Sequence, residues 1–144
     1  AGPARMTSGF EHFDVEADVG VRAWGPARGE AFAQAALGVF ALIVPPAEVV
    51  PRETREVRAQ GDSVETLLVN WINECLYLHD IEGFVVHRVG PVACDERVVH
   101  GVLHGEAVDA ARHHLGTIVK GATFHQLEVL EHEGLHQVRI IVDV

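Results

Sequence analysis

One segment, residues 62–79, constrains the fold more than any other because it repeats apolar residues at helical spacing. These residues recur every three or four positions and therefore share one face of an α-helix; they are Val64, Leu67, Leu68, Trp71, Ile72, Cys75 and Leu76. Asp62 is expected to cap the helix, with Glu65 at its third position. The segment predicts an amphipathic helix that ends near His79.

The rest of the chain predicts one more helix and a series of strands. Residues 30–44 repeat apolar side chains at helical spacing, and Pro45-Pro46 ends that helix. Alternating or β-branched apolar residues predict strands at 10–15, 18–24, 51–60, 84–89, 98–105, 117–130 and 135–143. Residues 131–134 predict a hairpin turn, and 107–115 a short helical or irregular connection. Two helices among six or seven mostly antiparallel strands make an α+β fold.

Composition favours one globular domain. The 144 residues are 48% hydrophobic and 22% charged, which is typical of a protein with its own core. We expect that domain to span 10–144, with 1–9 as a lead segment that is disordered or foreign to the natural chain. No apolar run approaches the roughly 18 residues of a membrane span. Cys75, on the apolar helix face, is expected to be buried, and two cysteines fit a cytoplasmic location.

The charge balance narrows the choice of partners. The formal net charge is −10, from 21 acidic residues against 11 lysines and arginines. Direct binding of nucleic acid is not expected, because that affinity rests on basic side chains that displace counterions. A basic protein partner or a metal ion fits the charge better, and the charge alone does not choose between them.

Two distant acidic residues predict a cation site. Asp18 stands beside an apolar run near the start, and Asp143 directly precedes Val144 at the end. If the two strands are neighbours, two carboxylates and the carboxylate of Val144 converge. Such a cluster is costly unless a cation or a basic partner neutralises it. Hard oxygen ligands of this kind suit Ca²⁺ or Mg²⁺.

A zinc-protease pattern in the sequence is interpreted as a coincidence. His132, Glu133 and His136 match H-E-x-x-H, but that chemistry needs both histidines on one helix. Gly134 lies inside the motif, and the flanking residues alternate as strands do. The sequence carries no local nucleophile motif and no phosphate loop, so the protein is not expected to be an enzyme.

Lys120 is the only lysine of the chain. An ordinary exposed charge on a strand is the commoner reading of such a residue. The neighbouring Gly121-Ala122-Thr123 allows another backbone to approach closely, which suits an interaction site instead.

From residue 10 to residue 144 the chain resembles the archease family. Five groups of residues, in order and at fitting spacing, carry the resemblance: Phe10-Glu11-His12 with Ala17-Asp18-Val19-Gly20-Val21; Glu30-Ala31-Phe32 through Leu37 to Phe40; Leu67-Leu68-Val69-Asn70-Trp71-Ile72-Asn73-Glu74; Lys120-Gly121-Ala122-Thr123-Phe124-His125; and Val142-Asp143-Val144. The resemblance implies a compact α+β sandwich. It also implies a non-catalytic activator of the RNA ligase that joins 3′-phosphate or 2′,3′-cyclic phosphate ends to 5′-hydroxyl ends, in tRNA splicing and RNA repair. Such a helper promotes guanylylation and turnover of the ligase.

The resemblance also implies roles for individual residues. Asp18, Asp143 and Val144 correspond to metal-binding positions of the family, for which Ca²⁺ is expected and Mg²⁺ or another divalent cation is the alternative. Lys120 corresponds to a lysine tied to ligase activation. The chain departs from the family by having Val15-Glu16 in place of a His-Thr pair. Glu16 and His125 are expected to support the metal ligands from outside the ligand set.

Two other functions stay open from the sequence. One is a general chaperone or modulator of RNA-processing proteins, such as an RNA methyltransferase. The other is a free-standing metallohydrolase built on His132 and His136. The oligomeric state also stays open, with a homo-oligomer as one alternative.

Overall fold

The computed structural model describes residues 7–144. Residues 1–6 of the expected lead segment 1–9 therefore lie outside the described residues. Two long helices, one short 3₁₀ helix and seven strands follow one another within residues 7–144. In order they are β1 (Gly9–Val15), β2 (Asp18–Gly25), α2 (Arg28–Ile43), η1 (Pro46–Glu48), β3 (Glu53–Gln60), α3 (Val64–Glu82), β4 (Phe84–Cys94), β5 (Val98–Ala107), β6 (Gly121–His132) and β7 (Leu135–Asp143). The predicted α+β class is confirmed.

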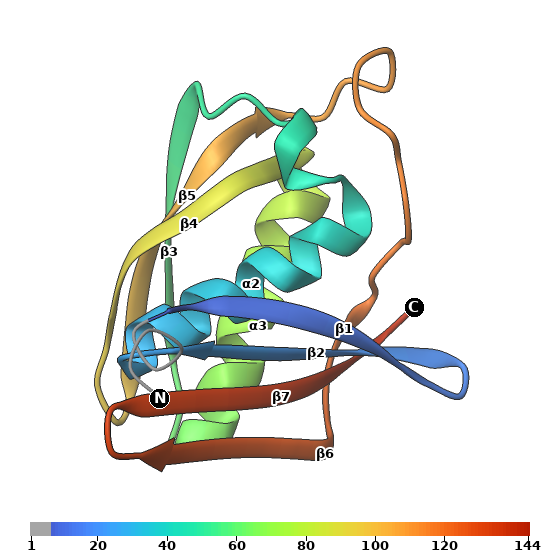
Figure 1. Cartoon of the computed structure of the whole chain (residues 1–144). Coiled ribbons are helices and arrows are strands. Elements are labelled where there is room, and N and C mark those ends of the chain that lie inside the picture. The colour runs from blue at the N-terminus through green and yellow to red at the C-terminus, as the bar shows by residue number, and fades with distance from the viewer. Residues whose placement is uncertain (1–6) are drawn as a thin grey trace.

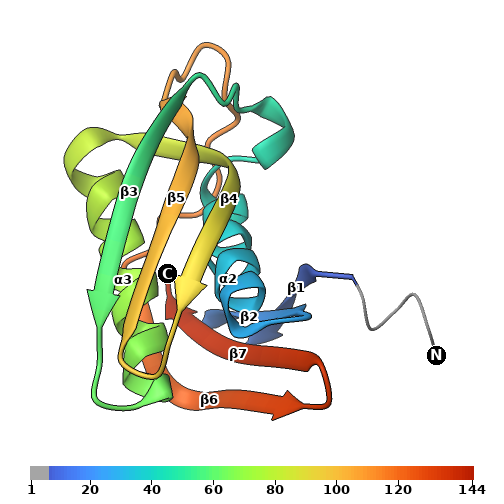
Figure 2. The same cartoon turned by 90° about the vertical axis from the view of Figure 1, so that its left-hand side faces the viewer.

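The strands form two antiparallel sheets. The larger sheet has the order β1-β2-β7-β6, and the smaller has the order β3-β5-β4. Helices α2 and α3 lie between the sheets, as the two views in Figure 1 and Figure 2 show, and each helix contacts strands of both. Within residues 7–144, neither helix combines the length and the apolar character that crossing a membrane requires.

Helix α2 fits closely between the sheets because two of its residues lack a side chain. A Cβ atom on Gly29 would lie 2.2 Å from the carbonyl oxygen of Val92 in β4. A Cβ atom on Gly38 would lie 2.6 Å from a methyl group of Val21 in β2. One glycine therefore permits close packing on the smaller sheet, and the other permits it on the larger.

The two helices also bind each other inside the core. Trp71 of α3 is fully buried, and its indole N–H donates a hydrogen bond of 2.9 Å to the carbonyl oxygen of Phe32 in α2. The predicted packing role of Trp71 is thereby confirmed. Cys75 is also buried, as predicted, and burial raises the pKa of its thiol.

The structure corrects both ends of the second helix. Ser63, not Asp62, is its N-cap, and the Ser63 hydroxyl oxygen accepts a 3.1 Å hydrogen bond from the N–H of Thr66. The helix continues past His79 to Glu82 and ends at Gly83, whose φ of 66° is the left-handed conformation that suits glycine. Serine and aspartate are both good caps, so the sequence alone did not decide between adjacent positions.

Several strand boundaries also differ from the prediction. Residues 117–120 are not part of β6, which begins at Gly121. Strands β4 and β5 extend beyond 89 and 105, to Cys94 and Ala107. The two strands lie next to each other in the smaller sheet, and the antiparallel ladder extends both of them.

The cap assignment predicts different effects for two neighbouring substitutions. Ser63→Ala should lower the free energy of unfolding by about 1 kcal/mol, because it leaves the N–H of Thr66 without its partner. Asp62→Ala, the matched control, should change stability by less than about 0.5 kcal/mol. Urea unfolding monitored by circular dichroism measures both, and a larger loss for Asp62→Ala would contradict the assignment.

Candidate functional site

Three neighbouring strands of the larger sheet bring the predicted site residues to one end of that sheet. Strand β2 pairs with β7 up to Val19 opposite Val142, and the next residues outward are Asp18 and Asp143. On the other side of β7, Asp143 pairs with Gly121, the first residue of β6. Figure 1 shows the β1–β2 turn, the start of β6 and the last residue of the chain on this same side.

The backbone of Lys120 also lies at this end of the sheet. Its N–H donates a 2.8 Å hydrogen bond to the carbonyl oxygen of Asp143, while its side chain is exposed. Within residues 7–144 the lysine side chain makes no ion pair. We call Asp18, Lys120, Asp143 and Val144 the sheet-end site.

A side chain of α3 helps to hold the first residues of β6 in place. The Asn73 side-chain oxygen accepts a 2.8 Å hydrogen bond from the N–H of Ala122. This contact fixes the strand two residues after Lys120. Asn73 lies within the stretch that resembles the archease family, but an exposed asparagine on a helix predicts no such contact by itself.

Glu16 lies in a turn beside the site, and His125 lies within strand β6. Glu16 occupies the two-residue turn between β1 and β2, with φ of 46°, rather than a strand position on the face of Asp18. His125 is exposed in the middle of β6, where the ladder to β7 is interrupted between Thr123 and Glu128. Their expected role in supporting the metal ligands stays a prediction.

The carboxylates of the site suit a hard cation. Among residues 7–144, neither Asp18 nor Asp143 forms an ion pair, so no basic side chain neutralises them. In the same part of the chain, no three His, Cys, Asp or Glu side chains are grouped so that they could hold a metal. A cation here would therefore need a further donor of another kind beside the two aspartates, and Val144 stays the predicted one. Carboxylate oxygens of this kind suit Ca²⁺ or Mg²⁺.

The residues of the H-E-x-x-H pattern lie in a hairpin and not in a helix. Glu133 and Gly134 form the turn between β6 and β7, with φ of 42° and 78°. His132 and His136 stand on the two different strands, and His132 pairs with Leu135 in the ladder. The helix that this zinc chemistry requires is absent from residues 132–136.

A buried carboxylate anchors the connection that leads to Lys120. Glu106 is only 3% exposed and forms ion pairs with Arg112 at 2.8 Å and Arg52 at 3.0 Å. It also accepts a 2.8 Å hydrogen bond from the N–H of Val50 and lies 3.0 Å from the buried His113 ring. The other ring nitrogen of His113 accepts from the N–H of Asp109, which makes the ring a donor to Glu106.

These contacts keep Glu106 ionised. Burial acts to raise its pKa, but the hydrogen bonds from Arg112, Val50 and His113 outweigh burial and lower the pKa to about 2. The sequence did not predict this cluster, because its members come from two separated segments, 50–52 and 106–113, without a local pattern.

The buried cluster predicts an acid-sensitive contribution to stability. The folded pKa of Glu106 lies below its ordinary value of 4.5, so the ionised group stabilises the fold fully above about pH 4.5. This stabilisation is lost as the pH falls toward about 2. Glu106→Gln should lower the free energy of unfolding by about 2 kcal/mol at pH 7, because charge-assisted hydrogen bonds are lost.

The pH dependence of unfolding tests this assignment. The difference between Glu106→Gln and the unaltered protein should shrink steadily below about pH 4.5 in urea unfolding curves. Glu96→Gln, an exposed control, should match the unaltered protein at every pH. A constant difference for Glu106→Gln down to about pH 2 would contradict the role of its charge.

The fold and the candidate site together define a class of protein. It is an α+β protein with two helices between two antiparallel sheets, and with carboxylates and a lysine gathered at one end of the larger sheet. The archease protein family (MTH1598/TM1083) matches residues 10–144, and the chain belongs to that family.

Individual relatives agree with this membership. The chain is 38% identical to the archease of Saccharolobus islandicus (strain Y.G.57.14 / Yellowstone #1), over 94% of this chain and 98% of the relative. The solution structure of protein 1598 from Methanobacterium thermoautotrophicum is 33% identical, with a TM-score of 0.80 over 94% of this chain and 99% of that one. A Thermotoga maritima protein described as an archease and possible chaperone shares the fold, with a TM-score of 0.61 at 14% identity, over 93% of this chain and 96% of that one.

Proposed function

We propose that this chain is a non-catalytic activator of an RNA ligase that joins 3′-phosphate or 2′,3′-cyclic phosphate ends to 5′-hydroxyl ends. In this role it promotes guanylylation and turnover of the ligase in tRNA splicing and RNA repair, in the cytoplasm. The ligase performs the chemistry, and the chain acts by binding to it.

The observation that carries the proposal is the convergence at the sheet-end site. A hydrogen bond of 2.8 Å ties the backbone of Lys120 to Asp143, and the pairing of β2 with β7 puts Asp18 beside them. An exposed lysine next to two unpaired carboxylates forms a charged pole that a protein partner can recognise. Membership of the archease family supports the ligase as that partner.

A divalent cation belongs to the same proposal. Asp18, Asp143 and Val144 would hold it, with Ca²⁺ as the first candidate and Mg²⁺ or another divalent cation as the alternative. When bound, the cation neutralises the carboxylates at the end of the sheet. Residues Glu16 and His125 are proposed to support the site from outside the ligand set.

A chaperone or modulator of RNA-processing proteins, such as an RNA methyltransferase, is the second candidate. The Thermotoga maritima relative described as a possible chaperone favours it. Affinity purification from cells separates the two functions. One dominant ligase partner supports the activator, whereas many unrelated client proteins support the chaperone.

The activator function predicts that single changes in the site slow the ligase. Lys120→Ala and Asp143→Ala should each reduce the rate of GMP transfer from GTP to the ligase by at least about tenfold, equal to about 1.4 kcal/mol. The reason is that each removes a charge from the surface that meets the ligase. The measurement is single-turnover guanylylation with radiolabelled GTP.

Two control variants remove charges of the same signs at other places on the surface. Arg97→Ala and Asp14→Ala remove one exposed cation and one exposed anion outside the site, and both should leave GMP transfer unchanged. Circular dichroism checks that all four variants keep the fold. Normal GMP transfer with both Lys120→Ala and Asp143→Ala would refute the activator function at this site.

The proposed cation site predicts a second effect, on the affinity for Ca²⁺. Asp18→Asn should weaken Ca²⁺ binding by at least about tenfold in isothermal titration calorimetry, because affinity depends on the number of charged ligands. Asp14→Asn, on the neighbouring strand β1, is the control and should bind Ca²⁺ as the unaltered protein does. Equal Ca²⁺ affinity in both variants would remove Asp18 from the ligand set.

A further inference from the structure

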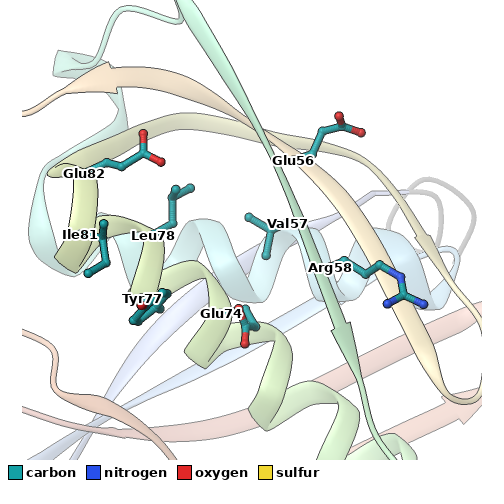
Figure 3. A pocket seen from close by; sticks show the side chains of 8 residues that line it. All are labelled: Glu56, Val57, Arg58, Glu74, Tyr77, Leu78, Ile81 and Glu82. Atoms are coloured by element: carbon teal, nitrogen blue, oxygen red, sulfur yellow. The ribbon is translucent and has the colours of Figure 1, made fainter.

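A groove lies between strand β3 and the C-terminal half of helix α3. The groove is open to solvent and has a volume of about 190 Å³. Figure 3 shows its lining side chains, which come from β3 on one side and from the C-terminal half of α3 on the other. None of them belongs to the sheet-end site.

Apolar side chains stand exposed on the helix side of the groove. Tyr77 is 64% exposed and Ile81 is 67% exposed, although both are large and follow each other at one helical turn. Leu78, beside them, is half-buried and packs against the core. This exposed pair leaves apolar surface in water that a partner could cover.

The strand side of the groove is an open sheet edge. Among residues 7–144, strand β3 pairs only with β5, through eight consecutive residue pairs without a bulge. The carbonyl oxygens of Thr54 and Gln60 accept hydrogen bonds from the side chains of Arg55 and Asn70, so the even-numbered residues direct their backbone outward. Within residues 7–144, the backbone groups of Glu56 and Arg58 have no such side-chain partner.

The rim of the groove is mainly acidic. Glu56, Glu74 and Glu82 line it, against Arg58 as the one basic residue of the lining. Glu82 is already paired with Arg55 at 2.8 Å. Glu74 forms no ion pair within residues 7–144. Its carboxylate and the whole-chain charge of −10 favour a basic occupant.

We propose that this groove binds an extended, basic segment of a partner protein, which adds as a strand to the open edge of β3. Its backbone pairs with Glu56 and Arg58, its apolar side chains cover Tyr77 and Ile81, and its Lys or Arg side chains reach Glu74. Main-chain pairing supplies affinity in this mode of recognition, and alternate side chains supply specificity. The inference holds whether or not the partner is an RNA ligase.

A synthetic peptide as long as β3, eight residues, with alternating lysine and valine, is the probe. Its binding is followed by NMR chemical shifts and by hydrogen exchange of the backbone amides. We expect shifts centred on Tyr77 and Ile81, and slower exchange at the amides of Glu56 and Arg58. A peptide with glutamate in place of lysine should bind at least about tenfold more weakly.

Variants of the groove test the contacts separately. The double variant Tyr77→Ser, Ile81→Ser should weaken binding of the lysine peptide by at least about tenfold, since it removes the apolar contact. Glu74→Lys should reverse the preference, so that the glutamate peptide binds more tightly than the lysine peptide. Lys120→Ala alters only the sheet-end site and should bind the lysine peptide unchanged. Failure of the groove to bind the peptide is therefore separate from failure of the activator function.

Three results would overturn the proposal. The first is the absence of shifts at the groove at millimolar peptide. The second is unaltered exchange at Glu56 and Arg58 in the presence of bound peptide, which excludes addition of a strand. The third is equal binding of the lysine and glutamate peptides, which excludes recognition by the acidic rim.

Discussion

The confinement of helix α2 between two sheets is the constraint on which the rest of the structure depends. A helix that contacts a sheet on each side needs apolar or small residues around most of its circumference, and buried positions occur on nearly every turn of α2. Gly29 and Gly38 let it approach β4 and β2 closely. The hydrogen bond from Trp71 to Phe32 then sets α3 against α2. The position of α3 in turn places Asn73, which holds the start of β6, and Tyr77, which lines the groove.

The sheet-end site is a product of topology rather than of a local motif. Asp18, Lys120 and Asp143 are far apart in the sequence and meet because β2, β7 and β6 are neighbours in the larger sheet. The β1–β2 turn, the connection before β6 and the end of β7 all reach the same side of that sheet. Glu106 contributes from a distance, because it anchors the beginning of the connection that ends at Lys120.

Local patterns predicted the helices, the strands and the hairpin turn at Glu133-Gly134, because each depends on the spacing of nearby residues. The prediction of Asp62 as the cap was wrong because Ser63, the next residue, is an equally good cap, and cross-strand pairing extended β4 beyond its own apolar pattern. The sequence predicted that Asp18 and Asp143 lie close together only on the condition that their strands are neighbours. The Glu106 cluster and the groove beside Tyr77 were not predicted, because both are assembled from segments whose contact no local pattern encodes.

The interruption in β6 has a consequence for the behaviour of the protein at high concentration. Strand β6 forms an edge of the larger sheet, and a regular edge is a template on which identical chains can stack. Between Thr123 and Glu128 the ladder is broken, and Gln126 has a φ of 52°. The backbone there does not offer the regular row of N–H and C=O groups that another strand would pair with. Irregular edges of this kind are one way in which natural sheets disfavour edge-to-edge stacking of identical chains.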